Sequence, residues 1–256
     1  MWGYSVQTVT RRHFLWCSGA LLWSALPVGQ LLCFAGDPPA QAGSADIRGR
    51  VFKNGAPASL WKWSREGFLY KQIGSEKVVC GICPNRCVLS KGDRSACRSK
   101  VNFGGKLYSL AYGNPCAANL DPVEKKPLLH FKPTTTAFSI AAAGCNFRCL
   151  NCQNYEISQA EPHAVRHIEM FPERVVKEAR RAGAASIAYT YSEPITFFEY
   201  MLDTARLAKA EGIYNLMISN GYINSQPLLE LCKVIDGANI NLKSFSDEHK
   251  ATAKHK

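Results

Sequence analysis

Apolar and polar positions follow a regular order over the second half of the chain. Four apolar runs of strand length predict strands, at 137–143, 186–191, 213–219 and 238–243. Apolar positions at helical spacing predict helices between them, at 172–182, 194–211 and 226–234. Strands that alternate with helices form right-handed βαβ units, so we predict an α/β fold with a parallel sheet. Such a sheet carries its ligand site at the carboxyl ends of its strands.

A cysteine-rich loop follows the first predicted strand. Gly144 ends the apolar run, and the loop then holds Cys145, Cys149 and Cys152 at Cys-x3-Cys-x2-Cys spacing. Three thiolates at this spacing can hold an iron–sulfur cube and leave one of its irons open for chemistry. Spacing alone leaves a second interpretation open, which is a zinc knuckle with a distant fourth ligand.

This loop resembles the hallmark of radical S-adenosylmethionine (SAM) enzymes. Residues 141–159 are similar to the version in the AmmeMemoRadiSam-system radical SAM proteins, relatives of the pyruvate formate-lyase activating enzymes. The resemblance implies a partial (β/α)6-type, TIM-like radical SAM barrel. It also implies that Cys145, Cys149 and Cys152 hold a [4Fe-4S] cluster whose fourth iron binds SAM, and that one-electron reduction cleaves SAM to a 5'-deoxyadenosyl radical. One departure is Asn151, where the superfamily usually has an aromatic residue.

The ends of the later strands carry the residues that this resemblance assigns to SAM. Ser192 and Glu193 follow the second strand and match the segment that holds the SAM amino group. Asn220 follows the third strand, in a turn similar to one near the ribose, and Lys243 ends the fourth, where it would face the SAM carboxylate or the substrate. Without the resemblance, Ser192 is interpreted as the cap of a proline-initiated helix and Asn220 as part of a plain turn.

A second group of cysteines precedes the predicted sheet. Seven of the eleven cysteines fall in two tight groups, which is typical of metal ligands rather than of a disulfide framework. The second group is spaced Cys-x2-Cys-x3-Cys-x9-Cys, at Cys80, Cys83, Cys87 and Cys97. These thiols can close the tetrahedron of a structural zinc ion or ligate a second iron–sulfur cluster. The segment resembles the cysteine-rich amino-terminal module of the AmmeMemoRadiSam proteins, and free buried thiols are the alternative.

Two further predictions concern the segment between the cysteine groups. Alternating residues at 101–112, with a Gly-Gly pair in the middle, predict a small hairpin. Residues 119–131 are rich in proline and charge, which favours a solvent-exposed turn for Lys125, Lys126 and His130. The alternative places these three side chains at the mouth of the active site.

The amino-terminal residues resemble a twin-arginine secretion signal. Arg11 and Arg12 precede an apolar run at 14–35, and residues 40–42 supply an A-x-A-like cleavage site. The pattern predicts export or membrane anchoring. Because SAM is made in the cytoplasm, a cytoplasmic location is the alternative.

The predicted domains follow from these motifs. They are a signal or anchor, a linker and lead-in, a cysteine-rich metal-binding module and a partial radical SAM core, at 1–42, 43–79, 80–133 and 134–256. Only four strands are predicted for the core, fewer than the resemblance implies, so we expect a truncated barrel whose last strand presents an unpaired apolar edge. Asn241 replaces the acid of a family Asp-Leu-Lys-Ser segment, and the chain departs from the resemblance after Glu248.

Composition narrows the classes of partner. The 256 residues are 46% hydrophobic, which is enough to build a core, and carry a formal net charge of +11. The basic residues are scattered and form no recognition helix, so we expect no specific nucleic-acid partner. The resemblance implies a reductant such as flavodoxin or ferredoxin and a protein substrate, as in glycyl-radical activation, or a small-molecule substrate. A non-catalytic metal-binding or electron-transfer protein, or an inactive fragment, is the competing interpretation.

Overall fold

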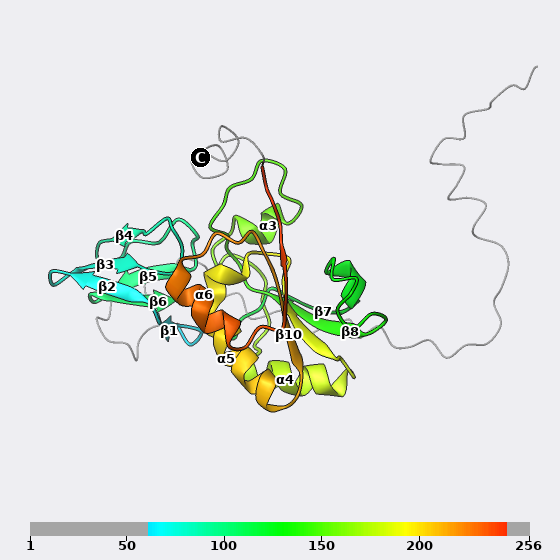
Figure 1. Cartoon of the computed structure of the whole chain (residues 1–256). Coiled ribbons are helices and arrows are strands. Elements are labelled where there is room, and N and C mark those ends of the chain that lie inside the picture. The colour runs from blue at the N-terminus through cyan, green and yellow to red at the C-terminus, as the bar shows by residue number, and fades with distance from the viewer. Residues whose placement is uncertain (1–60, 245–256) are drawn as a thin grey trace, which may run out of the picture. The chain divides into compact units, whose positions relative to one another are not determined.

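A computed structural model describes residues 61–244 (Figure 1). All of these residues belong to the compact unit formed by Pro38–Lys256. The predicted signal at 1–42 and the departure after Glu248 lie outside the described residues, so the localisation stays a prediction that cell fractionation would test. Within 61–244, no helix has the length and apolar character needed to cross a bilayer.

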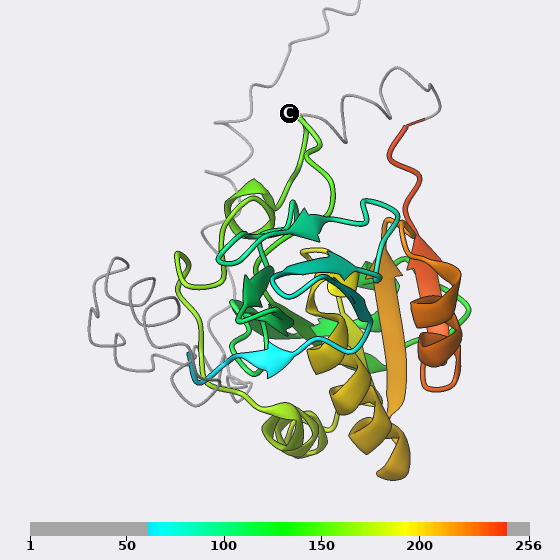
Figure 2. The ribbon, with the colours of Figure 1, turned by 90° about the vertical axis from the view of Figure 1, so that its left-hand side faces the viewer.

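A five-stranded sheet in the order β11-β10-β9-β8-β7 carries the second half of the described chain. Its strands are β7 Ala117–Pro122, β8 Thr136–Ala141, β9 Ser186–Tyr189, β10 Tyr214–Ser219 and β11 Gly237–Ile240. The strands β8 to β11 are parallel, which confirms the predicted strands and their pairing. The edge strand β7 pairs antiparallel with β8, so the sheet is mixed. In the described residues it is open, with β7 and β11 at its edges. Figure 2 shows the molecule from the side of the cysteine-rich strands β2 to β5.

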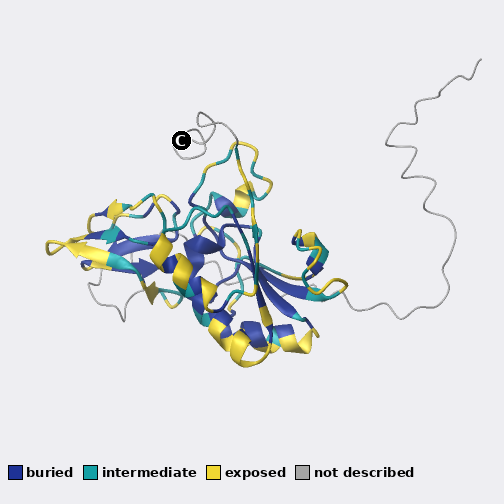
Figure 3. Ribbon diagram, viewed as in Figure 1, coloured by how far each residue is buried: buried dark blue, intermediate teal, exposed yellow. Residues whose placement is uncertain are grey.

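Helices cover one face of this sheet. They are α4 Pro172–Arg181, the 3-10 helix η3 Pro194–Phe197, α5 Phe198–Ala210 and α6 Ser225–Cys232. α4 packs on β8 and β9, and α5 packs on β9 and β10. The covered strands are buried along their length, as Figure 3 shows, because a parallel strand between two packed layers has no solvent-facing side. The predicted helices are confirmed, with one difference: the helix expected at 194–211 begins as a 3-10 turn.

The opposite face of the sheet packs against the segment that follows β7. Ala137, Ala188 and Leu216 from three strands form a small core with Val123, against which Phe131 packs. A chain segment therefore crosses the face that would line the interior of a barrel. This segment includes the 3-10 helix η2 Val123–Lys125.

Residues 119–131 are predicted to form a solvent-exposed turn, and for Lys126 the predicted exposure is wrong. Lys126 is 2% exposed and its Nζ donates to Asp121 Oδ2 at 2.6 Å, whereas Lys125 is exposed and donates to the other oxygen at 2.8 Å. Asp121 is buried at the end of β7, where a carboxylate without a cation would be costly. Burial alone would raise the pKa of Asp121, but hydrogen bonds from Lys125, Lys126 and Tyr191 hold it well below the usual range.

Two three-stranded sheets hold the cysteine-rich part of the chain. One is formed by β2 Tyr70–Ile73, β3 Lys77–Cys80 and β4 Val88–Leu89, and the other by β1 Arg65–Glu66, β6 Lys106–Ser109 and β5 Lys100–Phe103. The antiparallel β5–β6 pair confirms the predicted hairpin. Strands β1 to β3 lie largely in the region predicted as linker and lead-in, so at least residues 65–79 fold with the cysteine-rich module.

The last strand pairs on one side only within the described residues. β11 is bonded to β10, and its other edge carries no described partner strand. Ile240 is 56% exposed and Leu242 is 65% exposed. The predicted unpaired apolar edge is therefore present in this part of the chain.

Candidate metal centre

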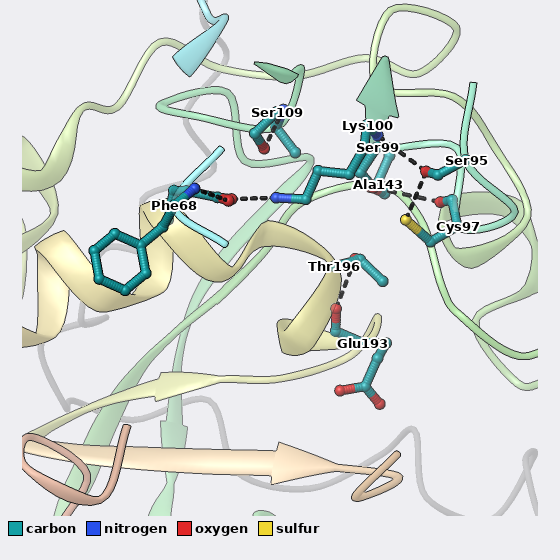
Figure 4. A network of polar contacts seen from close by, with 11 residues as sticks. Phe68, Ser95, Cys97, Ser99, Lys100, Ser109, Ala143, Glu193 and Thr196 are labelled. Atoms are coloured by element: carbon teal, nitrogen blue, oxygen red, sulfur yellow. Dashed lines mark hydrogen bonds and ion pairs between the residues drawn. The ribbon is translucent and has the colours of Figure 1, made fainter. Parts of the chain in front are cut away.

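The cysteine loop leaves β8 at its carboxyl end and is held from two sides. Ser99 Oγ, from the cysteine-rich module, donates to Ala143 O at 3.0 Å (Figure 4). Thr196 Oγ1, from η3, donates to Gly144 O at 3.3 Å. Gly144 has φ +114°, in the region that favours glycine. A Cβ at this position would lie 2.2 Å from Ser99 Oγ, so both the backbone angle and the close approach require glycine.

The three thiols of the loop are neighbours in space. Cys145 and Cys149 each interact electrostatically with Cys152 and with one another. Burial, followed by the nearby Glu193 carboxylate, raises the pKa of Cys145 to about 12. Burial also raises the pKa of Cys149, while the positive charge of Lys243 opposes the rise. A cationic centre is the natural way to keep such thiols ionised, because metal ligation requires the thiolate.

Glu193 lies at the carboxyl end of β9 and is 5% exposed. Its carboxylate accepts from Ser219 Oγ at 2.7 Å, from Asn220 N at 2.8 Å and from Ile195 N at 3.2 Å. Burial raises the pKa of Glu193, and these hydrogen bonds oppose the rise. The bond to Ile195 makes Glu193 the N-cap of η3. The interpretation of Ser192 as the cap is therefore wrong, because the Ser192 hydroxyl donates to Ala142 O at 2.5 Å and ties the ends of β8 and β9 together.

Asn220 joins the end of β10 to the cysteine loop. Its side-chain Nδ2 donates to Asn146 Oδ1 at 2.8 Å, and Asn146 Nδ2 donates to Tyr222 O at 3.0 Å. Asn146 lies between the first two cysteines of the loop and is 5% exposed. Sequence reasoning missed Asn146, because no spacing signal distinguishes it from the other residues between the cysteines.

The remaining candidates lie around the same strand ends. Lys243 is exposed and interacts electrostatically with both Cys149 and Glu193. Asn241 donates its backbone N–H to Ser219 O at 2.8 Å, which continues the β10–β11 pairing. The structure thus brings Cys145, Cys149, Glu193, Asn220 and Lys243 together at the carboxyl ends of the parallel strands, where the sheet topology predicts a ligand site.

The four thiols of the cysteine-rich module form a second cluster. Cys97 interacts electrostatically with Cys80, Cys83 and Cys87, although it follows them in the chain by ten residues or more. Backbone N–H groups donate to three of these sulfurs, from Ile82 to Cys80, from Asn85 to Cys83 and from Ala96 to Cys87. Such bonds favour the thiolate, although burial raises the pKa of Cys80 and Cys83 to about 12.

The two cysteine clusters are in contact through their loops. Asn85 Nδ2 donates to Asn146 O at 3.1 Å, and the Asn146 side chain also bonds to Cys83. A Cβ on Gly144 would lie 2.6 Å from Cys97 O. Within 61–244, no three His, Cys, Asp or Glu side chains converge on the geometry of a single metal ion. A four-iron cube is wider than one ion. The nine cysteines among residues 61–244 are free thiols, seven of them in these two clusters, and they supply its ligand type.

Comparisons with known proteins agree with this site. Residues 139–256 match the Radical SAM superfamily. The chain is 44% identical over 190 residues to an uncharacterized protein of Methanocaldococcus jannaschii, a match that covers 74% of this chain and 56% of that protein. It is 28% identical over 109 residues to the pyruvate formate-lyase 1-activating enzyme of Escherichia coli K12, covering 41% of this chain and 44% of that enzyme.

The chain spans about half the length of the curated relatives it matches. The family match begins within β8 and includes the cysteine loop and the strand ends described above. The match to this superfamily implies a [4Fe-4S] cluster and SAM, and suggests an enzyme. Residues 139–256 are thus similar to the radical SAM superfamily, and the chain is similar to a pyruvate formate-lyase 1-activating enzyme.

Proposed function

We propose that the chain is a radical SAM enzyme whose cluster is held by Cys145, Cys149 and Cys152. The observation that carries this proposal is the position of Glu193, which is buried beside Cys145 and bonded to the end of β10 through Asn220 N at 2.8 Å. A three-cysteine loop on its own could bind many kinds of metal centre. Here the loop lies beside the Glu193 carboxylate and the end of β10, polar groups that can bind an amino acid.

The residues present fit both groups. Three free thiols would ligate three irons of a cube and leave the fourth for SAM. A carboxylate has about four acceptor positions, and three are used at Glu193, so one remains for the ammonium of SAM. The exposed Lys243 supplies a positive charge for the carboxylate. When bound and reduced, the cluster supplies the electron that cleaves SAM to a 5'-deoxyadenosyl radical.

We propose a protein as the substrate and a flavodoxin or ferredoxin as the reductant. The similarity to a pyruvate formate-lyase 1-activating enzyme supports hydrogen abstraction from a partner protein. The match to that enzyme covers 41% of this chain, so a small-molecule substrate is the second candidate. The exposed edge of β11 favours the competing class, a non-catalytic iron–sulfur protein or an inactive fragment, because it leaves the ligand face partly uncovered.

The test is reductive cleavage of SAM by the full chain. After anaerobic reconstitution with iron and sulfide, we expect dithionite and SAM to yield 5'-deoxyadenosine, measured by chromatography. Cys149→Ala should abolish this product, because the cube loses a ligand, and Glu193→Gln should weaken SAM binding. Cys232→Ala is the matched control, since this cysteine is exposed at the end of α6. Product formation no greater in wild type than in Cys149→Ala would favour the non-catalytic alternative.

A further inference from the structure

Arg98 lies between the two cysteine clusters. It follows Cys97 directly, and its guanidinium interacts electrostatically with both Cys97 and Cys145. The flanking residues bring its backbone close to the cysteine loop. Ser99 Oγ donates to Ala143 O at 3.0 Å, and Figure 4 shows Cys97, Ser99 and Ala143 within one polar network.

The guanidinium is fixed relative to the loop of Cys145. Arg98 Nη2 donates to Gln159 Oε1 at 2.7 Å, and Gln159 Nε2 donates to Phe147 O at 3.0 Å. Phe147 stands between Cys145 and Cys149, and its own N–H donates to Cys145 Sγ at 3.4 Å. One hydrogen-bonded chain therefore positions the charge of Arg98 beside the first cysteine of the loop.

The other terminal nitrogen of this guanidinium has no partner among the described residues. Arg98 Nη1 is buried and makes no hydrogen bond within 61–244. Burying a donor of a permanently charged group without an acceptor is costly. The backbone of Arg98 is also left-handed, with φ +69°, a conformation that a non-glycine residue adopts at a further cost. Costs of this kind persist where the surrounding structure holds a residue in place for a function.

We propose that Arg98 Nη1 donates a charge-assisted hydrogen bond to a sulfur atom of the [4Fe-4S] cluster held by Cys145, Cys149 and Cys152, and so stabilises its reduced form. The inference rests on the proposed function. Reduction adds one negative charge to a cluster, and hydrogen bonds to the sulfurs are among the terms that set its potential. The bond through Gln159 and Phe147 assigns Arg98 to this cluster rather than to the centre at Cys97.

The test is a redox titration of the reconstituted full chain with dithionite, followed by electron paramagnetic resonance. A [4Fe-4S] cluster accepts one electron, and the signal that is missing from Cys149→Ala belongs to the Cys145 centre. In Arg98→Gln we expect the ratio of reduced to oxidised Cys145 centre to fall about tenfold at a given solution potential, which is a shift of about 59 mV for a one-electron couple. Arg98→Gly, which removes the backbone strain at φ +69°, should give the same shift.

The matched control is Arg148→Gln. Arg148 is an exposed arginine within the cysteine loop, so this variant loses the same charge without losing a buried donor. We expect it to shift the ratio by much less than Arg98→Gln, because solvent screens an exposed charge.

The possible outcomes separate the two proposals. Wild-type protein that takes up no cluster at Cys145, Cys149 and Cys152 overturns the proposed function and this inference with it. Normal uptake with an unchanged ratio in both Arg98 variants overturns this inference alone. Equal shifts in Arg98→Gln and Arg148→Gln overturn it as well, because the loss of any nearby positive charge would then explain the shift. A shift confined to the signal that remains in Cys149→Ala would assign Arg98 to the Cys97 centre instead.

Discussion

At the scale of single residues, Glu193 takes the cap role that the sequence assigned to Ser192 and keeps the position that the resemblance assigns to a SAM ligand. Its carboxylate caps η3 through Ile195 N and also holds the end of β10 through Ser219 Oγ and Asn220 N. These bonds orient it beside Cys145 before any ligand arrives. A cap residue can therefore be a preorganised ligand for SAM, since the structural bonds leave one acceptor position open.

Gly144 gives the sharpest prediction at this scale. Gly144→Ala should lower the free energy of unfolding by about 3 kcal/mol or more, through backbone strain and overpacking against Ser99 and Cys97. Gly183→Ala is the control, because Gly183 has φ +66° but no atom within 4 Å of an added Cβ, so it should lose only about 1–2 kcal/mol. Urea denaturation measures both. Similar losses in the two variants would contradict the close approach at Gly144.

At the scale of elements, the cysteine-rich module is built onto the sheet rather than tethered to it. Asn224, which precedes α6, donates through its backbone and side chain to Ile82 O at 2.9 Å and Gly81 O at 2.8 Å. The strand β5 of the module contributes Lys100, which forms a buried ion pair with Glu199 of α5. Glu199 also accepts from Phe68 N at 3.1 Å, so one carboxylate joins three segments.

The buried pair should contribute far more to stability than an exposed one. Glu199→Gln is expected to cost about 3–5 kcal/mol, because Lys100 is 1% exposed and would be left charged without its carboxylate. Glu211→Gln breaks the exposed ion pair between Glu211, at the end of α5, and Arg180. It should lower the free energy of unfolding by about 0–1 kcal/mol. Chemical denaturation measures the free energy of unfolding of both variants. A cost for Glu199→Gln as small as that of the control would show that the module is only loosely attached.

At the scale of the whole molecule, two cysteine clusters far apart in the sequence share one region of the fold. The contacts run from Asn85 to Asn146 at 3.1 Å and from Ser99 to Ala143 at 3.0 Å. The module is therefore placed to support the loop that we propose holds the catalytic cluster. We propose that its own thiols bind either zinc or a second iron–sulfur centre.

The metal content of variants tests this arrangement. A chain with Cys145, Cys149 and Cys152 all changed to Ala should retain metal, because Cys80, Cys83, Cys87 and Cys97 come from β3 and from loops of the two small sheets, none of which includes the cysteine loop. Iron, zinc and acid-labile sulfide are measured after purification, and retained sulfide distinguishes a cluster from zinc. The control also replaces Cys80, Cys83, Cys87 and Cys97 and should be metal-free. Loss of all metal from the first variant would mean that the module is no independent site.

The sequence by itself determined the local features of this protein. Short-range periodicity predicts the order of strands and helices from 136 to 240 and the hairpin at β5–β6, and short-range spacing identifies the two cysteine groups. Candidates at strand ends followed because parallel strands place their carboxyl ends along one edge. These are properties that neighbouring residues set among themselves.

Only the tertiary structure decided which distant groups meet. Lys126 is buried because β7 pairs with β8 and removes Asp121 from water, which a proline-rich and charged segment does not reveal. Asn146 and Arg98 gained their roles because the loops of two cysteine groups pack together. Pairings of this kind depend on long-range contacts, and no periodicity within one segment encodes the partner that another segment will supply.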